Sequence, residues 1–322
     1  MTDLLTVDGM GKTFGTKRFL SMKPTYSVTA LRNVSFSIAK GETVGVVGES
    51  GCGKSTLARC VLDLITPTTG SVLFDGTDLT ALDPASKRKM RGRIQMIFQD
   101  PYSSLNGKRT IGKTLAEPLY VHQGMKFKDA LPRILAVLDE VGMPRSAVDK
   151  YPHEFSGGQR QRIAIARALI LEPDLIVADE SVSALDVSVQ AQVLLLLRRI
   201  QQERGLSYLF ITHDLGVVRN FCDRVLVMYL GSIVESGPVG ALLSNPKHPY
   251  TKSLRDAAPI PDVSKRQSLA LLEGEIPSPA NPPSGCAFHP RCPRASEICR
   301  RDAPALQDTH DQRSFACHSP QD

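Results

Sequence analysis

The chain has 322 residues, of which 42% are hydrophobic, and a formal net charge of +6. This composition is typical of a soluble protein with one large domain, or a large and a small one, and the mild charge selects no partner. The start, MTDLLTVDGMGKTF, lacks the apolar core of a secretory signal, and no run reaches the roughly 18 apolar residues of a membrane span. We therefore expect a cytosolic protein whose membrane role, if any, needs a partner.

Short apolar runs alternate with helical periodicity along the chain. Buried strands are predicted at 42–48, 93–99, 174–179 and 207–212, and an edge strand or hairpin at 224–237. Helices are predicted from Lys54 onward, at 188–204, and over most of 101–171, with breaks at Pro118, Gly142, Pro144 and Pro152. This alternation predicts an α/β core with a mostly parallel sheet, into which the helical block is inserted.

The character of the chain changes after about Lys247. Prolines crowd the stretch IPSPANPPSG, periodicity disappears, and four cysteines follow. We therefore predict a large domain at 1–247, with its helical block at about 101–171. Residues 248–322 are expected to form a loop-rich C-terminal extension without an obvious core.

The stretch GESGCGKST, residues 48–56, fits the phosphate-loop pattern between a predicted strand and a predicted helix. Its glycines let backbone N–H groups point at phosphate oxygens, and the helix N-terminus adds favourable partial charge. We expect Lys54 to contact the β- and γ-phosphates of ATP, and the Ser55 hydroxyl to bind Mg²⁺. Cys52 is interpreted as a small filler without a redox role. The predicted nucleotide-binding residues are Gly48, Ser50, Gly51, Cys52, Gly53, Lys54, Ser55 and Thr56.

A second acidic site follows the apolar run LIVAD. Asp179 ends this run, at the carboxyl end of a predicted strand, where open α/β sheets bind ligands. We expect the Asp179 carboxylate to hold Mg²⁺ through water. Glu180 is then placed to polarise the attacking water as a catalytic base.

The stretch FSGGQRQRIAIARALI, residues 155–170, resembles the signature of ABC-type ATPases. Ser156 suits a helix N-cap, and the glycines after it let the backbone approach an anion. The resemblance implies that Ser156, Gly157, Gly158 and Gln159 face the γ-phosphate bound by an opposite subunit. Hydrolysis would then need a dimer.

Other elements of the ABC ATPases follow in order. The resemblance implies that Gln99, in IFQDP, touches the metal and the attacking water and senses the transmembrane partner. It implies that SALD, residues 183–186, crosses the dimer interface, and that His213, in ITHDL, contacts the γ-phosphate. An aromatic residue upstream is expected to stack on adenine, with Phe14 and Tyr26 as the competing candidates. The implied fold is a P-loop core with an antiparallel β subdomain and an inserted helical subdomain.

The resemblance becomes narrower toward the C-terminus. VMYLGSIVESG, HPYTKSL and GEIPSPANPPSGCAFHPRCP resemble the ATPase subunits of dipeptide and oligopeptide importers, a group that includes nickel uptake systems. This implies ATP hydrolysis coupled to peptide import, with nickel or another small solute as the alternative cargo. A soluble ABC ATPase acting on nucleic acid or ribosomes is disfavoured by the single module, so no nucleic-acid partner is expected. One departure is Ser181, where the group usually has proline.

The resemblance also implies partners. They are a second ATPase subunit, expected to be a paralogue in a heterodimer, two transmembrane permease subunits and an extracytoplasmic solute-binding protein. The chain would sit on the cytoplasmic face of the cell membrane as a peripheral protein.

Four cysteines, Cys286, Cys292, Cys299 and Cys317, are spaced as Cys-x5-Cys-x6-Cys-x17-Cys. This is neither the usual zinc spacing nor a ferredoxin spacing, so zinc, a cluster, and free or disulfide-forming thiols all stay open from the residues alone. Some relatives carry a [4Fe–4S] cluster in this region, and the resemblance implies that these four thiolates are its ligands. Either metal would stabilise a loop-rich tail.

Overall fold

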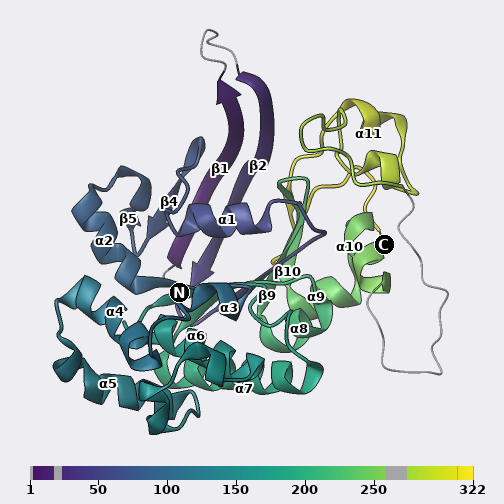
Figure 1. Ribbon diagram of the computed structural model, residues 1–322. Helices are drawn as coiled ribbons and strands as arrows, with labels where there is room; N and C mark the ends of the chain where they lie inside the picture. The colour runs from purple at the N-terminus through teal and green to yellow at the C-terminus, as the bar shows by residue number, and fades with distance from the viewer. Residues whose placement is uncertain (1–2, 18–23, 258–273, 310, 322) are drawn as a thin grey trace, which may run out of the picture. The chain divides into compact units, whose positions relative to one another are not determined.

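The computed structural model describes residues 3–17, 24–257, 274–309 and 311–321 (Figure 1). The side chains at 16–17, 24–26, 101 and 103 lie outside this description. The chain divides into two compact units, one mainly of residues 39–42 and 81–211, the other of residues 4–38, 43–80 and 212–322. The domain boundary predicted at residue 247 stays a prediction.

The strands of the first unit run parallel. β6 (Ile94–Ile97) pairs with β7 (Leu175–Asp179), and β7 pairs with β8 (Ser207–Ile211). Every residue of β7 and β8 is buried, which is why these segments are continuous apolar runs without alternation. All three strands were predicted from these runs, and the structure confirms them.

The helices of the first unit are α2 (Pro84–Arg93), α3 (Pro101–Ser104), α4 (Ile111–Gln123), α5 (Phe127–Glu140), α6 (Gly157–Leu169) and α7 (Val187–Arg204). The break predicted at Pro118 is wrong, because α4 runs through this proline. Proline in a helix interior removes a backbone hydrogen bond, at about 3 kcal/mol. The buried face around it, formed by Leu115, Ala116 and Leu119, offsets that loss and keeps the helix continuous.

The second unit contains the strand that leads to the phosphate loop. β3 (Thr43–Val47) pairs in parallel with β9 (Arg224–Tyr229), and β9 forms the predicted hairpin with β10 (Ser232–Pro238). Both residues between β9 and β10, Leu230 and Gly231, have positive φ, as a tight hairpin turn requires. The helices here are α1 (Lys54–Val61), α8 (Leu215–Phe221), α9 (Val239–Ser244), α10 (Pro249–Ala257) and α11 (Glu297–Arg301).

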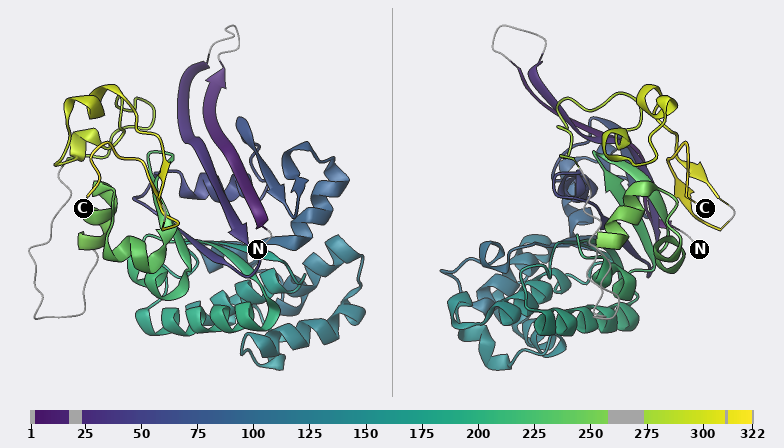
Figure 2. Two further views of the ribbon diagram at one scale, coloured as in Figure 1. Left: turned by 180° about the vertical axis from the view of Figure 1, so that it is seen from behind. Right: turned by 90° about the vertical axis from the view of Figure 1, so that its right-hand side faces the viewer.

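A four-stranded sheet of the second unit has the order β2-β1-β4-β5. Its strands are β1 (Asp3–Lys17), β2 (Pro24–Ala39), β4 (Thr69–Phe74) and β5 (Thr77–Asp78). Figures 1 and 2 show β1 and β2 as two long neighbouring strands that run in opposite directions. This is the antiparallel β subdomain that the resemblance implied.

The C-terminal extension is tied to the sheet and has a core. β12 (Ser314–Phe315) pairs with β10, and β11 (Gln307–Asp308) pairs with β12. The fully buried Glu235 carboxylate of β10 accepts the backbone N–H groups of Lys247 (2.7 Å) and His248 (2.8 Å). The prediction of a tail without an obvious core therefore needs correction. The buried ring of Phe288 packs against Tyr229 and Tyr250, so the tail shares a core with β9 and α10.

Candidate functional site

The phosphate loop runs from β3 into α1, and its glycines allow a very close approach to neighbouring backbone. A Cβ on Gly48 would lie 2.3 Å from the Met228 carbonyl oxygen, and one on Gly53 would lie 2.5 Å from that of Ala30. Gly53 also has φ 109°, a conformation that side chains rarely adopt. Only glycine fits both positions, as the sequence motif requires.

Lys54 begins α1, and its side chain turns back into the loop. The ammonium is buried and donates to the backbone oxygens of Gly48 (2.7 Å) and Glu49 (3.0 Å). Ser50 and Ser55 are exposed, and nothing lies within 4 Å of where a Cβ on Gly51 would be. The loop therefore presents one cation and an open rim, a suitable arrangement for an anion.

Cys52 lies beneath the loop and is 4% exposed. Burial raises the pKa of its thiol, with Lys54 opposing that rise. A thiol with a raised pKa is a poor nucleophile, because the thiolate is the reactive form. This fits the interpretation of Cys52 as a filler.

His213 follows β8 and belongs to the same unit as the phosphate loop. The neighbouring Thr212 donates its backbone N–H to the Val46 oxygen at 3.1 Å, which fixes this segment beside β3. The His213 side chain is exposed. Asp214 caps α8 through the N–H groups of Gly216 and Val217, so the turn carrying His213 is held on both sides.

The two adenine-stacking candidates lie on the long antiparallel ribbon. Phe14, on β1, is 41% exposed, and the Lys12 ammonium lies 5.2 Å from its ring centroid. An exposed ring beside a cation is suited to stack on a nucleotide base. Tyr26 lies on β2, and its side chain is outside the described part of the structure.

In the first unit, Glu180, one of the two predicted acidic residues, contacts Gln99. Asp179 ends β7 and is 7% exposed, and Gln99 Nε2 donates to Glu180 Oε2 at 3.0 Å. Glu180 has φ 47°, in the left-handed region, and its N–H donates to the Ile211 oxygen at the end of β8. A non-glycine residue held in this conformation often marks a functional position. The next residue, Ser181, is buried and its hydroxyl has no hydrogen-bond partner among the described residues.

The signature segment forms the predicted N-cap of α6. Ser156 Oγ accepts the Gln159 N–H at 3.4 Å, and Gln159 Oε1 accepts the Ser156 N–H at 3.0 Å, which completes a capping box. Its two glycines differ. A Cβ on Gly158 would lie 2.5 Å from a Val189 methyl of α7, whereas nothing lies within 4 Å of one on Gly157. Gly158 therefore serves packing, and Gly157 leaves the backbone accessible.

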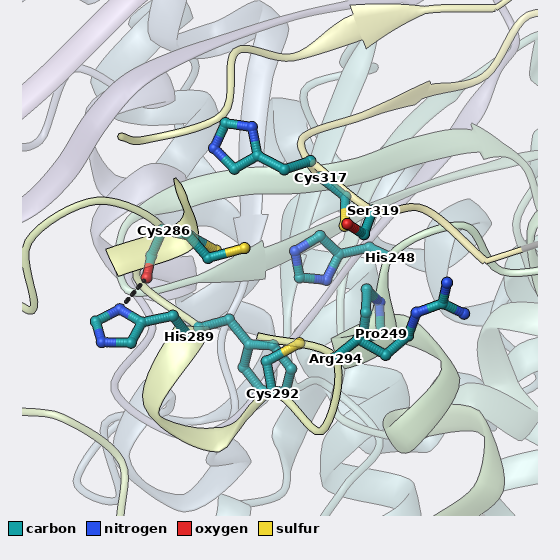
Figure 3. A pocket seen from close by; sticks show the side chains of 11 residues that line it. His248, Pro249, Cys286, His289, Cys292, Arg294, Cys317 and Ser319 are labelled. Carbon is teal, nitrogen blue, oxygen red and sulfur yellow. Dashed lines mark hydrogen bonds between the residues drawn. The ribbon is translucent and has the colours of Figure 1, made fainter. Parts of the chain in front are cut away.

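The four cysteines of the extension line one cavity, together with His248 and His289 among others (Figure 3). Figure 3 shows the thiols of Cys286, Cys292 and Cys317 directed into it from separate stretches of chain. The volume of this cavity is about 10 Å³, enough for about one water molecule. Burial raises the pKa of the Cys286, Cys292 and Cys317 thiols.

Four thiols are a donor set that suits zinc or an iron–sulfur cluster. A metal site also requires its donor groups to lie close together around one point. Across residues 3–17, 24–257, 274–309 and 311–321, no three Cys, His, Asp or Glu side chains are grouped closely enough to hold a metal ion.

The family is decided by comparison with known proteins. Residues 31–183 match the model of the ABC transporter family, and residues 234–299 match that of the oligopeptide/dipeptide transporter C-terminal region. The chain is 48% identical to the dipeptide transport ATP-binding protein DppF of Haemophilus influenzae, over 98% of this chain and 96% of that protein. It is 51% identical to the oligopeptide transport ATP-binding protein OppF of Escherichia coli K12, over 92% and 89%. The chain belongs to the ABC transporter family.

Solved ABC cassettes agree with this assignment. The ATP-binding cassette MJ0796, solved as a dimer bound to ADP and phosphate, matches with a TM-score of 0.65 and 29% identity, over 73% of this chain and 98% of that one. CbiO1 of Clostridium perfringens, part of an ABC transporter complex, matches with a TM-score of 0.65 and 27% identity, over 76% and 92%. The fold is thus that of an ABC cassette.

Sequence reasoning missed three residues of this ABC chain, namely Glu49 of the phosphate loop and the two side chains that bind it. Glu49 bonds to Arg291 and to Tyr250, yet Arg291 is 242 residues away along the chain. The only local signal is Glu49 itself, an acidic residue at a position where the phosphate-loop pattern allows any residue. This signal does not indicate which side chain Glu49 contacts.

Gly158→Ala is expected to lower the free energy of unfolding by about 1–3 kcal/mol, because the new methyl overlaps Val189 across the α6–α7 contact. Gly157→Ala is the matched control and should leave it unchanged or slightly raised, since its methyl meets open space. Urea unfolding of the full chain measures both. Equal losses for the two variants would contradict the packing role of Gly158.

Proposed function

We propose that this chain is the ATP-hydrolysing subunit of an ABC importer of dipeptides or oligopeptides. One observation carries the proposal: the ABC family match is joined in the same chain to a match of the oligopeptide/dipeptide C-terminal region. Relatives whose names specify dipeptide and oligopeptide transport align over nearly its whole length, which supports the cargo class.

The nucleotide roles follow from the chemistry of each residue. Lys54 and the loop N–H groups neutralise and orient the phosphates, and the exposed Phe14 ring stacks on adenine. Oxygen ligands suit Mg²⁺, and Ser55, Gln99 and Asp179 supply a hydroxyl, an amide and a carboxylate for it. When bound, the ion supplies positive charge to the phosphate oxygens.

Glu180 is the residue we assign to the attacking water. Its carboxylate is oriented by Gln99, and its backbone by Ile211, so it can accept a proton from water in a fixed direction. His213, exposed on its turn, is assigned a contact to the γ-phosphate. Both assignments rest on the family pattern together with the local geometry of each residue.

The active form we propose is a dimer with a second ATPase subunit, taken to be a paralogue. Ser156–Gln159 of each subunit would complete the nucleotide site of the other, and the open backbone at Gly157 suits that contact. Hydrolysis then removes the γ-phosphate that joins the two subunits, and the dimer opens.

We place the assembly on the cytoplasmic face of the cell membrane, with two permease subunits and an extracytoplasmic solute-binding protein. Within the described residues, no helix has both the length and the apolar character to cross a bilayer. The permeases would therefore supply the spans that the import path requires.

The cysteine cavity is assigned a structural metal, an iron–sulfur cluster with zinc as the alternative. The support is that Cys286, Cys292, Cys299 and Cys317 all line one cavity. Bound metal would join residues 286–299 to Cys317. No step of ATP hydrolysis depends on it.

Glu180→Gln is expected to keep MgATP binding and lose roughly 10²–10⁴-fold in ATPase rate, because an amide cannot accept the proton of the attacking water. Nucleotide binding by calorimetry and phosphate release measure the two effects. Glu203→Gln, on an exposed position of α7, is the control and should behave as wild type. Undiminished ATPase activity in Glu180→Gln would remove the base assignment.

In cells, uptake of labelled di- and oligopeptides should depend on this chain. Replacing wild type with Glu180→Gln should abolish peptide uptake and leave nickel uptake intact, because hydrolysis drives only the transporter that this subunit serves. Loss of nickel uptake alone would refute the peptide cargo while leaving the ATPase assignment standing.

Anaerobically purified protein should be brown and contain iron and acid-labile sulfide, since four thiolates are the ligand set of such clusters. Cys292→Ser should lose most of the metal, whereas Cys60→Ser, at a buried position on α1, should retain it. Elemental analysis distinguishes iron from zinc. Metal-free protein from both the wild type and the Cys60 control would reject the assignment.

A further inference from the structure

Glu49, the second residue of the phosphate loop, is held at three points. Its backbone N–H donates to the Tyr250 hydroxyl at 2.8 Å, and its carbonyl oxygen accepts the Lys54 ammonium at 3.0 Å. Its carboxylate accepts two parallel bonds from Arg291, Nη1 to Oε2 at 2.7 Å and Nη2 to Oε1 at 2.9 Å. A residue tied in this way has little freedom to rotate.

Arg291, which binds the Glu49 carboxylate, is buried. Its side chain is 4% exposed and that of Glu49 is 22% exposed, so the ion pair is largely removed from water. Nη1 also lies 3.5 Å from the Tyr229 hydroxyl. Desolvation offsets most of the attraction in such a pair, so stability alone is a weak reason for it, whereas fixed geometry is a good one.

Two of the three groups that hold Glu49, those of Arg291 and Tyr250, come from outside the nucleotide-binding segments. Arg291 ends the short 3-10 helix η5 (His289–Arg291), immediately before Cys292, and Tyr250 lies on α10. The Tyr250 ring is fully buried, with its centroid 4.7 Å from that of Tyr229 and 5.4 Å from that of Phe288. The C-terminal extension thus reaches the phosphate loop through a packed aromatic cluster.

We propose that Arg291 and Tyr250 are positioning residues that hold the phosphate loop, through Glu49, in the shape that binds nucleotide phosphates. This rests on the proposed phosphate-binding role of the loop. Lys54 must leave the Gly48 and Glu49 oxygens to reach a phosphate. Because Arg291 and Tyr250 bind Glu49, the backbone N–H groups of the loop keep their direction while the ammonium moves. Preorganisation of this kind raises affinity because less order is lost on binding.

The same contacts couple the cysteine cavity to the nucleotide. Phe288 and Cys292 line the cavity, and Arg291 lies directly before Cys292. Binding couplings are reciprocal, so if the extension orders the loop, nucleotide on the loop orders the extension. Amide hydrogen exchange at residues 288–292 should therefore slow when MgADP is bound.

The test compares MgADP affinity of full-length variants by titration calorimetry. Arg291→Met and Glu49→Gln should each weaken binding about tenfold, because each removes the bidentate charged pair. Tyr250→Phe keeps the ring and should weaken binding about threefold. Arg291→Lys keeps the charge but cannot donate two parallel hydrogen bonds to Glu49, so its MgADP affinity should lie between those of wild type and Arg291→Met. Arg301→Met is the matched control, since Arg301 is 72% exposed in the same extension and should bind as wild type.

Two further measurements separate positioning from general stability. The double variant Glu49→Gln/Arg291→Met should bind no more weakly than either single variant, and it should lose the MgADP-dependent slowing of amide exchange at residues 288–292. Lys54→Ala should abolish binding in every background. Binding unaffected by Lys54→Ala would refute the phosphate-loop assignment itself. Loss of binding in Lys54→Ala, with wild-type affinity in folded Glu49→Gln and Tyr250→Phe, would overturn only the positioning role.

Discussion

The phosphate loop passes so close to two strands that it admits no side chain at two of its positions. The Met228 carbonyl of β9 faces Gly48, and the Ala30 carbonyl of β2 faces Gly53, at 2.3 Å and 2.5 Å from where a Cβ would lie. The loop is therefore set against β9 on one side and against the antiparallel sheet on the other. Gly53 is the N-cap of α1, so the close contact at Gly53 also sets where α1 begins.

The extension belongs to this same arrangement. Glu235 binds the backbone at Lys247 and His248 and so fixes where α10 begins. α10 in turn brings Tyr250 to the phosphate loop. A buried carboxylate that accepts two N–H groups is costly to disturb, because both donors would lose their partner in a place that water does not reach. The C-terminal region is in this sense part of the nucleotide-binding unit.

The sequence predicts those parts of the fold whose signals are local. Strands β3, β7 and β8 are buried along their whole length and lie in largely apolar runs. The phosphate loop and the Ser156 cap are short patterns, and each is typical of one local structure. The loop residues, Gln99 and Glu180 were expected to belong to one nucleotide-binding set, but a hydrogen bond between Gln99 and Glu180 was not predicted. Structure adds their local geometry, including the left-handed backbone of Glu180, which no neighbouring residue type predicts.

The remaining features depend on contacts between distant residues. Pro118 is a helix breaker by propensity, yet the packed face of α4 outweighs it. The signature glycines show the limit most clearly. Gly157 and Gly158 are adjacent and identical, and the sequence assigns both to an anion. Val189 lies against Gly158 alone, so one glycine is required by the packing of α6 on α7, and the other leaves the backbone free for a ligand. Residue type alone cannot separate these two requirements, because the difference lies in α7, about thirty residues further along the chain.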